Sequence, residues 1–175
     1  MRRRPLWLVL GVLLLAAGGT SFDGLVGSEA PVEEPAVAGT DEVVRVVDGD
    51  TVVLRVAGKS RLIGVDTPEV FGGRECYGRE ASAFAKRILR PGLRVGVERD
   101  VEQRDRYGRT LLYLLLPDRR SFNELLVSEG IAVPLTIPPN VRHAERFRSL
   151  ARRAREREAG LWSARACGGD PDRSV

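Results

Sequence analysis

Residues 43–56 read VVRVVDGDTVVLRV, and this stretch decides the class of fold that the 175-residue chain can adopt. On both sides of Asp48-Gly49-Asp50 the apolar residues follow the period of two that is typical of β-strands. Aspartate and glycine tolerate the backbone angles of tight turns, so the central motif predicts a hairpin. Two antiparallel strands joined by a short turn are therefore expected here.

More strands are expected downstream. Ala57-Gly58-Lys59 predicts a second turn, which leads into a strand over residues 60–65 and completes a three-stranded meander. Two further strands are expected over residues 93–97 and 110–116. The strands come in runs rather than in strict alternation with helices, which argues against a doubly wound sheet and favours a small closed barrel.

Helical patterns lie between and after these strands. Apolar residues at helical spacing over residues 81–89 predict a helix that Pro91-Gly92 ends. Ser121-Phe122-Asn123-Glu124 has the form of a capping box for a short helix ending at Gly130. Asn140 is expected to cap a last helix, whose arginine-rich face is either solvated or in contact with nucleic acid.

The first 42 residues read as a leader and a tether. Three arginines and a short apolar run over residues 6–17 are typical of an export signal within residues 1–20. No clean small-residue cleavage site is visible, so an uncleaved anchor on the outer face of the membrane stays open beside secretion. Residues 21–42 hold six acidic residues and two prolines, a composition typical of a solvated tether.

The acidic tether masks a basic domain. Of the 28 basic residues, three lie in the leader, and six of the 24 acidic residues lie between Asp23 and Glu42. The part from Val43 onward therefore has a net charge of about +7, which suits an acidic polymer as partner. Ordinary solubility would explain the same balance.

Cys76 and Cys167 are the two cysteines of the chain. In an exported protein they predict one disulfide, and two free thiols are the alternative. The two cysteines are 91 residues apart (167 − 76). Closing a loop of that length would stabilise the folded state by roughly 4–5 kcal/mol in chain-entropy models.

Carboxylates and arginines follow the strand-like runs, and they suit phosphodiester hydrolysis. The transition state of that reaction gains negative charge, so it requires fixed positive charge, an activated water and often a metal. Asp50 and Asp66 are hard oxygen ligands suited to Ca²⁺ or Mg²⁺. Arg61 and Arg109 could each donate two hydrogen bonds to one phosphate, and Glu69 could accept the proton of water.

Spacing alone does not bring these groups together. A straight strand from Arg61 to Asp66 would span roughly 16 Å, and the two side chains would point to opposite faces. Convergence needs a bend or a bulge, and Gly64 is a suitable place for one.

The order of the motifs resembles the staphylococcal nuclease family. The resemblance runs from about Val43 to Trp162 through Asp48-Gly49-Asp50-Thr51, Val65-Asp66-Thr67-Pro68-Glu69, Asp105-Arg106-Tyr107-Gly108-Arg109 and Gly160-Leu161-Trp162. It implies an α+β, mainly β domain over residues 43–164, built as a five-stranded OB-fold barrel with three helices and followed by a tail over residues 165–175. It also implies Ca²⁺-dependent cleavage of single-stranded DNA and RNA that leaves 3′-phosphate ends.

The resemblance carries roles to individual positions. Asp50 and Asp66 would be Ca²⁺ ligands, with Thr67 helping through its backbone carbonyl. Glu69 would orient or deprotonate the water, and Arg61 and Arg109 would clamp the phosphate. The substrate-binding positions would be Arg106, matching a lysine that reaches a terminal phosphate, and Tyr107, matching a phosphate-contacting tyrosine.

The sequence departs from the best-known member of that family in two segments and in the added cysteine pair. The loop over residues 70–76 is shorter, and residues 133–140 lack the tyrosine on which a base would stack. His143 is expected to lie in a cap region or at the surface rather than to act in catalysis. A monomer is expected.

Two other classes of function compete with an exported nuclease. One is a non-catalytic OB-fold module that binds nucleic acid or protein, as degenerate members of the family do. The other is a small exported barrel whose positive face contacts an acidic cell envelope. The presence of both aspartates, both arginines and Glu69 favours the nuclease.

Overall fold

The computed structural model describes residues 39–70 and 75–170. The expected leader over residues 1–20, the tether up to residue 38, residues 71–74 of the shortened loop and residues 171–175 of the tail lie outside the described residues. Within the described part of the chain, helices long and apolar enough to cross a membrane are absent.

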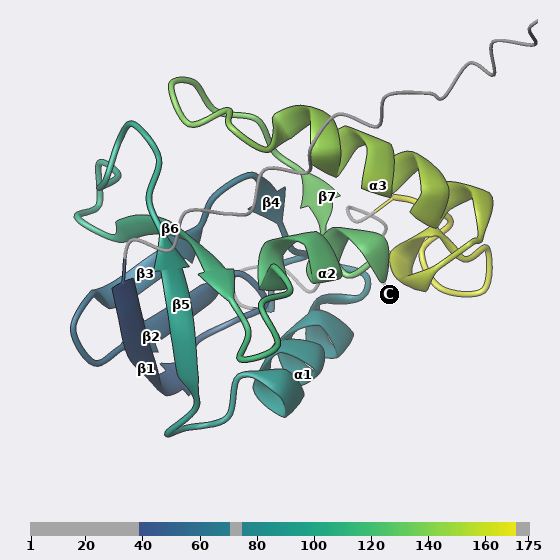
Figure 1. The fold of residues 1–175 in the computed structure, drawn as a ribbon. Coiled ribbons are helices and arrows are strands. Elements are labelled where there is room, and N and C mark those ends of the chain that lie inside the picture. The colour runs from purple at the N-terminus through teal and green to yellow at the C-terminus, as the bar shows by residue number, and fades with distance from the viewer. Residues whose placement is uncertain (1–38, 71–74, 171–175) are drawn as a thin grey trace, which may run out of the picture. The chain divides into compact units, whose positions relative to one another are not determined.

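Five strands of the described residues close into a barrel in the order β1-β2-β3-β6-β5 (Figure 1). The strands are β1 (Gly39–Val46), β2 (Thr51–Leu54), β3 (Gly58–Leu62), β5 (Arg94–Glu98) and β6 (Thr110–Leu115). β3 and β6 pair in parallel, and the other neighbours pair antiparallel. The predicted hairpin around Asp48-Gly49-Asp50 is confirmed, because Val46 of β1 lies opposite Val52 of β2.

β1 begins at Gly39, so the expected start of the domain at Val43 is four residues too late. Residues 39–42 pair with β5 instead of belonging to the tether. The reason is a buried carboxylate: Asp41 accepts backbone N–H groups from Val56 at 3.0 Å and from Ala57 at 2.8 Å. The acidic side chain that indicated a solvated tether instead binds the turn between β2 and β3.

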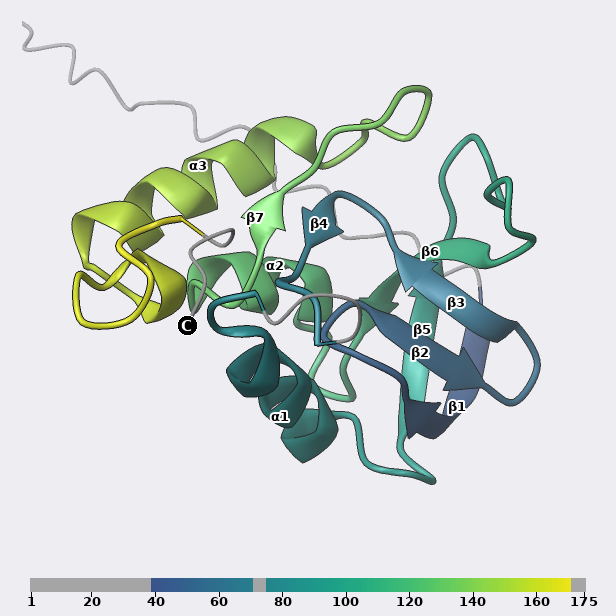
Figure 2. The same cartoon turned by 180° about the vertical axis from the view of Figure 1, so that it is seen from behind.

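The strand expected over residues 60–65 is broken into two. β3 ends at Leu62, and β4 (Val65–Asp66) pairs antiparallel with β7 (Val133–Pro134). Gly64 lies between them with φ of 79°, which confirms it as the place where the chain bends. A Cβ on Gly64 would lie 2.3 Å from the Phe147 ring, so a side chain there has no space. Figure 2 shows the β4–β7 pair between the barrel and the last helix.

Three α-helices are present in the described residues: α1 (Gly78–Ile88), α2 (Phe122–Ser128) and α3 (Ala144–Glu156), followed by a 3₁₀ turn over Gly160–Trp162. The capping box is confirmed, since Ser121 Oγ accepts the Glu124 N–H. The prediction that Asn140 caps α3 is wrong, because its amide bonds the backbone of Glu102 and His143 takes the N-cap position. The Nε2 of His143 lies 3.0 Å from a carboxylate oxygen of buried Glu98.

The core fills the barrel and continues beneath the helices. Leu54, Leu62 and Leu112 belong to β2, β3 and β6 and are buried. Phe122 of α2 and Phe147 of α3 are also buried. A smaller buried cluster contains Leu161 and the disulfide that joins Cys76 to Cys167. The disulfide predicted from the sequence is therefore present, and the described residues contain no free cysteine.

Candidate active site

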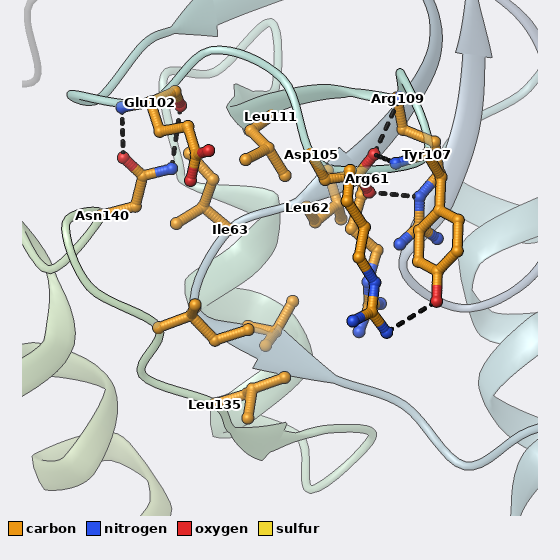
Figure 3. Close-up of a pocket in the computed structure, with 14 residues that line it drawn as sticks. Arg61, Leu62, Ile63, Glu102, Asp105, Tyr107, Arg109, Leu111, Leu135 and Asn140 are labelled. Carbon is orange, nitrogen blue, oxygen red and sulfur yellow. Dashed lines mark hydrogen bonds and ion pairs between the residues drawn. The ribbon is translucent and has the colours of Figure 1, made fainter.

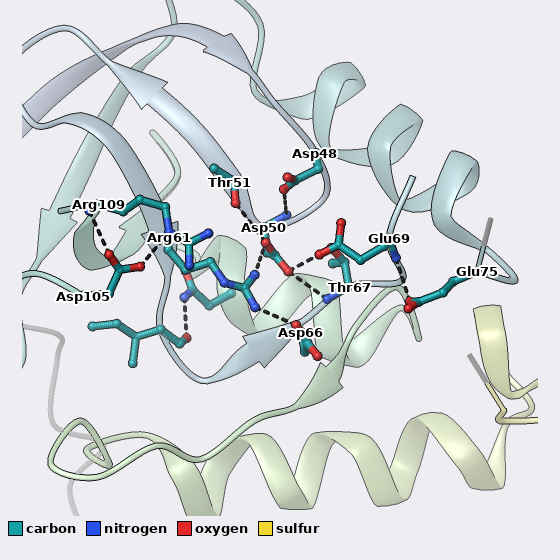
Figure 4. Close-up of polar contacts among 12 residues, drawn as sticks. Asp48, Asp50, Thr51, Arg61, Asp66, Thr67, Glu69, Glu75, Asp105 and Arg109 are labelled. Carbon is teal, nitrogen blue, oxygen red and sulfur yellow. Dashed lines mark hydrogen bonds and ion pairs between the residues drawn. The ribbon is translucent and has the colours of Figure 1, made fainter. Parts of the chain in front are cut away.

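Arg61 joins two aspartates that are far apart along the chain (Figure 4). Its guanidinium forms an ion pair with Asp50 through Nη1 and donates to Asp66 Oδ1 through Nη2 at 2.6 Å. Asp50 lies directly before β2, which pairs with the β3 strand that holds Arg61. Asp66 reaches the same guanidinium because the chain turns at Gly64. The convergence that the sequence left open is thus present.

Asp50 is held in one orientation by several donors. The residue is only 5% exposed, and its Oδ2 accepts the Thr67 backbone N–H at 2.8 Å and the Thr67 hydroxyl at 2.9 Å. Its Oδ1 accepts the Thr51 hydroxyl at 3.2 Å. Asp48 supports the turn, since its Oδ1 accepts the Asp50 backbone N–H. Because buried carboxylates need such partners, the position of Asp50 is well determined.

The donor set at this corner fits a hard divalent cation. The carboxylates of Asp50 and Asp66 both lie within bonding distance of one guanidinium, so they are close to each other. The Asp66 side chain is 48% exposed, which leaves the corner open to solvent. No group of three or more histidine, cysteine, aspartate or glutamate residues suited to a metal occurs in the described residues. A bound ion would therefore need backbone oxygens and waters as well, which Ca²⁺ and Mg²⁺ accept readily.

Glu69 lies in the same negatively charged corner. Burial raises the pKa of this carboxyl group above its usual value, and the nearby charge of Asp48 raises it further. The guanidinium of Arg61 acts in the opposite direction, and Glu75 and Asp66 raise the pKa again. A carboxylate with a raised pKa is a stronger base, so Glu69 is suited to accept a proton from water.

Arg109 is oriented by a turn built around Asp105. The Asp105 carboxylate accepts the backbone N–H groups of Tyr107 and Arg109, each at 2.9 Å, and the Arg109 Nε at 2.6 Å. Burial alone would raise the pKa of Asp105, but the hydrogen bonds from Arg109 and Tyr107 lower it below its usual value. Asp105 engages Nε, so the outer nitrogens of the Arg109 fork are available for an anion.

The Tyr107 ring is close to two guanidinium groups. Arg106 donates to the Tyr107 hydroxyl at 2.7 Å and lies 4.8 Å from the ring centroid, while Arg109 lies 5.4 Å from it. Both distances are typical of cation–π contacts. Tyr107 is 68% exposed, so this cluster presents positive charge and an aromatic ring to solvent.

A pocket of about 510 Å³ connects these groups (Figure 3). Figure 3 shows Arg61, Tyr107 and Arg109 at one end of the pocket and the apolar side chains of Ile63 and Leu135 at the other. Arg106, Leu111 and Ile137 also line the pocket. Its volume is typical of small-ligand sites. The arrangement offers cationic donors to a phosphate at one end and an apolar surface at the other.

Asn140 and Glu102 form a clamp at the apolar end. The Asn140 amide accepts the Glu102 N–H at 2.8 Å and donates to the Glu102 carbonyl at 2.9 Å. Sequence reasoning missed this pair, because an asparagine before a helix has the same pattern as a cap. Sequence reasoning also did not predict that Leu135 and Ile137 line the pocket. It noted only that the segment containing them lacks the tyrosine on which a base would stack.

The predicted site residues therefore fall into two adjoining groups and one separate pair. Asp50, Asp66, Thr67 and Glu69 surround Arg61 on one side, and Arg106, Tyr107 and Arg109 share a pocket with Arg61 on the other. Cys76 and Cys167 form a disulfide elsewhere.

The sequence of this chain is similar to those of several known proteins. A family model described as staphylococcal nuclease homologue matches residues 59–164. Thermonuclease of Staphylococcus hyicus is 41% identical over 130 residues, which cover 71% of this chain and 76% of that protein. Thermonuclease of Staphylococcus intermedius is 39% identical over 126 residues, covering 69% and 74%. Endonuclease YncB of Bacillus subtilis is 35% identical over 127 residues, covering 68% and 59%.

Proposed function

We propose a calcium-dependent nuclease activity for this chain, which belongs to the staphylococcal nuclease family. Its substrates would be single-stranded DNA and RNA, and its products would carry 3′-phosphate ends. The observation that carries the proposal is the Arg61 guanidinium, which contacts Asp50 and Asp66 and also lines the pocket that contains Arg109.

The cationic end of the pocket would bind the phosphodiester. Arg61 and Arg109 would donate to the non-bridging oxygens, whose negative charge grows in the transition state. Loss of one such donor in an enzyme typically lowers the rate by about 10²–10³-fold. Arg106 and Tyr107 also line the pocket and would contact a neighbouring phosphate.

The cation would be held by the Asp50 and Asp66 carboxylates and the Thr67 carbonyl. When bound, it would supply positive charge to the phosphoryl oxygens and acidify a nearby water. Hydrogen bonds from Thr51 and Thr67 orient the Asp50 carboxylate, which supports this role.

Glu69 would take the proton of the attacking water. The oxygen of that water would then bond to phosphorus while the bond between phosphorus and the 5′-oxygen breaks. The 5′-oxygen would keep the electron pair of that bond and take a proton from solvent, which leaves a 5′-hydroxyl on one product and the phosphate on the 3′-oxygen of the other. The raised pKa of Glu69 supports this role, since it makes the carboxylate a better proton acceptor.

The apolar end of the pocket would receive the base. Leu135 and Ile137 offer a surface that every base can contact, which supports cleavage without strict sequence preference. Stacking of a base on an aromatic ring contributes about 1–3 kcal/mol, so aliphatic side chains here favour weaker substrate binding than a tyrosine would.

The leader composition supports an extracytoplasmic location for this activity. We propose that the protein acts as a secreted monomer, or from an uncleaved N-terminal anchor on the outer face of the membrane. The basic balance of the domain would attract the polyanionic substrate in either case.

The decisive experiment is incubation of the purified protein with single-stranded DNA and RNA in calcium or in EGTA, followed by analysis of the product ends. Cleavage in calcium that stops in EGTA and leaves 3′-phosphates is expected. Asp50→Asn should raise the calcium concentration needed for half-maximal rate by more than 10-fold, whereas Asp118→Asn, in an exposed turn, should leave it unchanged. Binding of nucleic acid without calcium-dependent cleavage would instead identify a binding module.

A further inference from the structure

We propose that Glu75, anchored by the disulfide between Cys76 and Cys167, is a positioning residue that fixes the backbone of Glu69. This inference rests on the proposed function, because it assigns Glu75 a role through the residue that would accept the proton. It gives the disulfide a catalytic purpose in addition to stability.

The first observation is a direct hydrogen bond. The Glu69 backbone N–H donates to Glu75 Oε2 at 2.8 Å. Hydrogen bonds to an ionised acceptor are roughly twice as strong as neutral ones, so this contact can hold the main chain at Glu69. Figure 4 shows Glu75 on the side of Glu69 that faces away from Asp50.

The second observation is close packing at the Glu69 carbonyl. Gly78 begins α1, and a Cβ on Gly78 would lie 2.5 Å from the Glu69 carbonyl oxygen. Gly78 in turn donates its N–H to the Glu75 carbonyl at 3.2 Å. The peptide groups of Glu69 are therefore held against residues 75–78 on both their donor and acceptor sides.

The third observation is the anchor on the other side. Thr67, two residues before Glu69, donates its backbone N–H to buried Asp50 at 2.8 Å. Only Pro68 separates Thr67 from Glu69, whose N–H makes the bond to Glu75, and proline restricts the backbone further. The backbone that carries the Glu69 side chain is thus held at Thr67 by Asp50 and at Glu69 by Glu75.

The disulfide anchors the backbone at Glu75. Cys76 follows Glu75 directly and is bonded to Cys167, and both are buried against Leu161. The tail is tied to the rest of the domain by backbone hydrogen bonds from Gly169 to Leu161 and from Leu161 to Gly130, each 2.9 Å long.

Tyr77 shows that this junction is tightly constrained. It lies between the disulfide and α1 with φ of 74°, a left-handed conformation that is unfavourable for a bulky residue. Such a conformation persists where the surrounding structure determines it, which the disulfide and Gly78 do here.

The test compares steady-state rates of Glu75→Ala, Glu75→Gln and Glu80→Ala with those of the unmodified chain. Glu80 is an exposed residue of α1 and serves as the matched control. Glu75→Ala should lower kcat by at least about 10-fold with little change in KM, because a displacement of about 1 Å can cost about 10²-fold in rate. Glu75→Gln keeps a neutral acceptor oxygen and should recover part of the loss.

A double-mutant cycle separates positioning from general damage. In a Glu69→Ala background, Glu75→Ala should cause no further fall in kcat, because its effect passes through Glu69. An equal fall in both backgrounds, or an unchanged kcat in the single variant, would overturn the role of Glu75. Replacing both Cys76 and Cys167 by alanine should also lower kcat, measured at a temperature below the midpoint of thermal unfolding of the variant. An unchanged kcat would show that the disulfide has no part in positioning Glu69.

Amide hydrogen exchange at Glu69 supplies a readout that does not depend on catalysis. Exchange should be faster in Glu75→Ala and in the double cysteine variant than in Glu80→Ala. Unchanged exchange would overturn the anchoring itself. Failure of the unmodified chain to cleave any substrate would refute the nuclease proposal instead, so the two failures are distinguishable.

Discussion

Arg61 shows how one side chain can serve two partners. Its guanidinium neutralises Asp50 and Asp66 in the structure, and the same side chain lines the pocket where a phosphate would bind. Two nearby carboxylates repel each other, and a positive charge beside them offsets that repulsion. Arg61 supplies this charge in the structure. Under the proposed function a bound cation would supply it instead, which would leave the guanidinium for the substrate.

Arg109 gives the clearest prediction at the scale of the residue. Arg109→Ala should lower kcat by about 10²–10³-fold, because it removes a donor to the developing charge. Folding should change little, since the Arg109 side chain pairs with the partly exposed Asp105 and contacts the exposed ring of Tyr107. Arg152→Ala on the exposed face of α3 is the matched control for loss of one positive charge. Equal rates in the two variants would show that Arg109 is wrongly assigned.

At the scale of the element, the strand β1 depends on one aspartate. Burial alone would raise the pKa of Asp41, but the backbone N–H groups of Ala57, Val56 and Glu42 lower it below its usual value of 3.8. A lowered pKa means that the ionised form is favoured by folding. The stabilisation is therefore present above the usual pKa and is lost as the pH falls through the lowered one.

Asp41→Ala should accordingly lower the free energy of unfolding at neutral pH by about 1–3 kcal/mol, because it leaves backbone donors without their acceptor. The difference from the unmodified chain should shrink below pH 4, where Asp41 begins to be protonated in the unfolded chain. Urea unfolding at a series of pH values measures this, with Asp118→Ala as control. A difference that stays constant down to pH 2 would argue against the charged contact.

The turn between β3 and β4 gives the second prediction at this scale. Gly64 and Gly58 both have positive φ, but only Gly64 has no space for a Cβ, because the Phe147 ring lies against it. Gly58→Ala should therefore cost about 1–2 kcal/mol of stability, the usual penalty of the left-handed conformation. Gly64→Ala should cost clearly more and should also lower activity, since the turn directs Asp66 toward Arg61. Similar losses in both variants would contradict the importance of this packing.

At the scale of the whole molecule, the disulfide connects the two ends of the described helical region. Cys76 precedes α1 and Cys167 follows the 3₁₀ turn, with a sequence separation of 91 residues. A bridge across so long a segment reduces the freedom of the unfolded chain, which raises the relative stability of the folded state.

Replacing both cysteines by serine should lower the free energy of unfolding by about 4–5 kcal/mol in the chain-entropy model. Urea denaturation of the oxidised protein, the reduced protein and the double variant measures this difference. The reduced protein should resemble the double variant. A loss below about 1 kcal/mol would mean that the unfolded chain is already restricted or that the bridge is offset by strain.

Much of the fold and the candidate site could be predicted from the sequence, because the relevant signals are local. Alternating valines, turn residues at Asp48-Gly49-Asp50 and the capping box at Ser121 determine strands, a hairpin and a helix start within a few residues. The residue types of the site were identifiable for the same reason, since the charge and bonding capacity of aspartate, glutamate and arginine are known from the residue type alone. Even the bend at Gly64 could be located, because glycine is the residue that a turn of this kind favours.

Other features were decided only by the tertiary structure, because they depend on contacts between distant segments. Asp41 has the composition of a tether residue until the turn at Val56 and Ala57 reaches it. Asn140 has the sequence pattern of a helix cap, but in the fold its amide bonds the backbone of Glu102. The sequence determined which groups this protein has for binding a phosphate and a cation, and closure of the barrel decided that Asp50, Arg61 and Asp66 meet. The physical reason is that strand pairing and the Gly64 turn, rather than local propensity, set the distances between them.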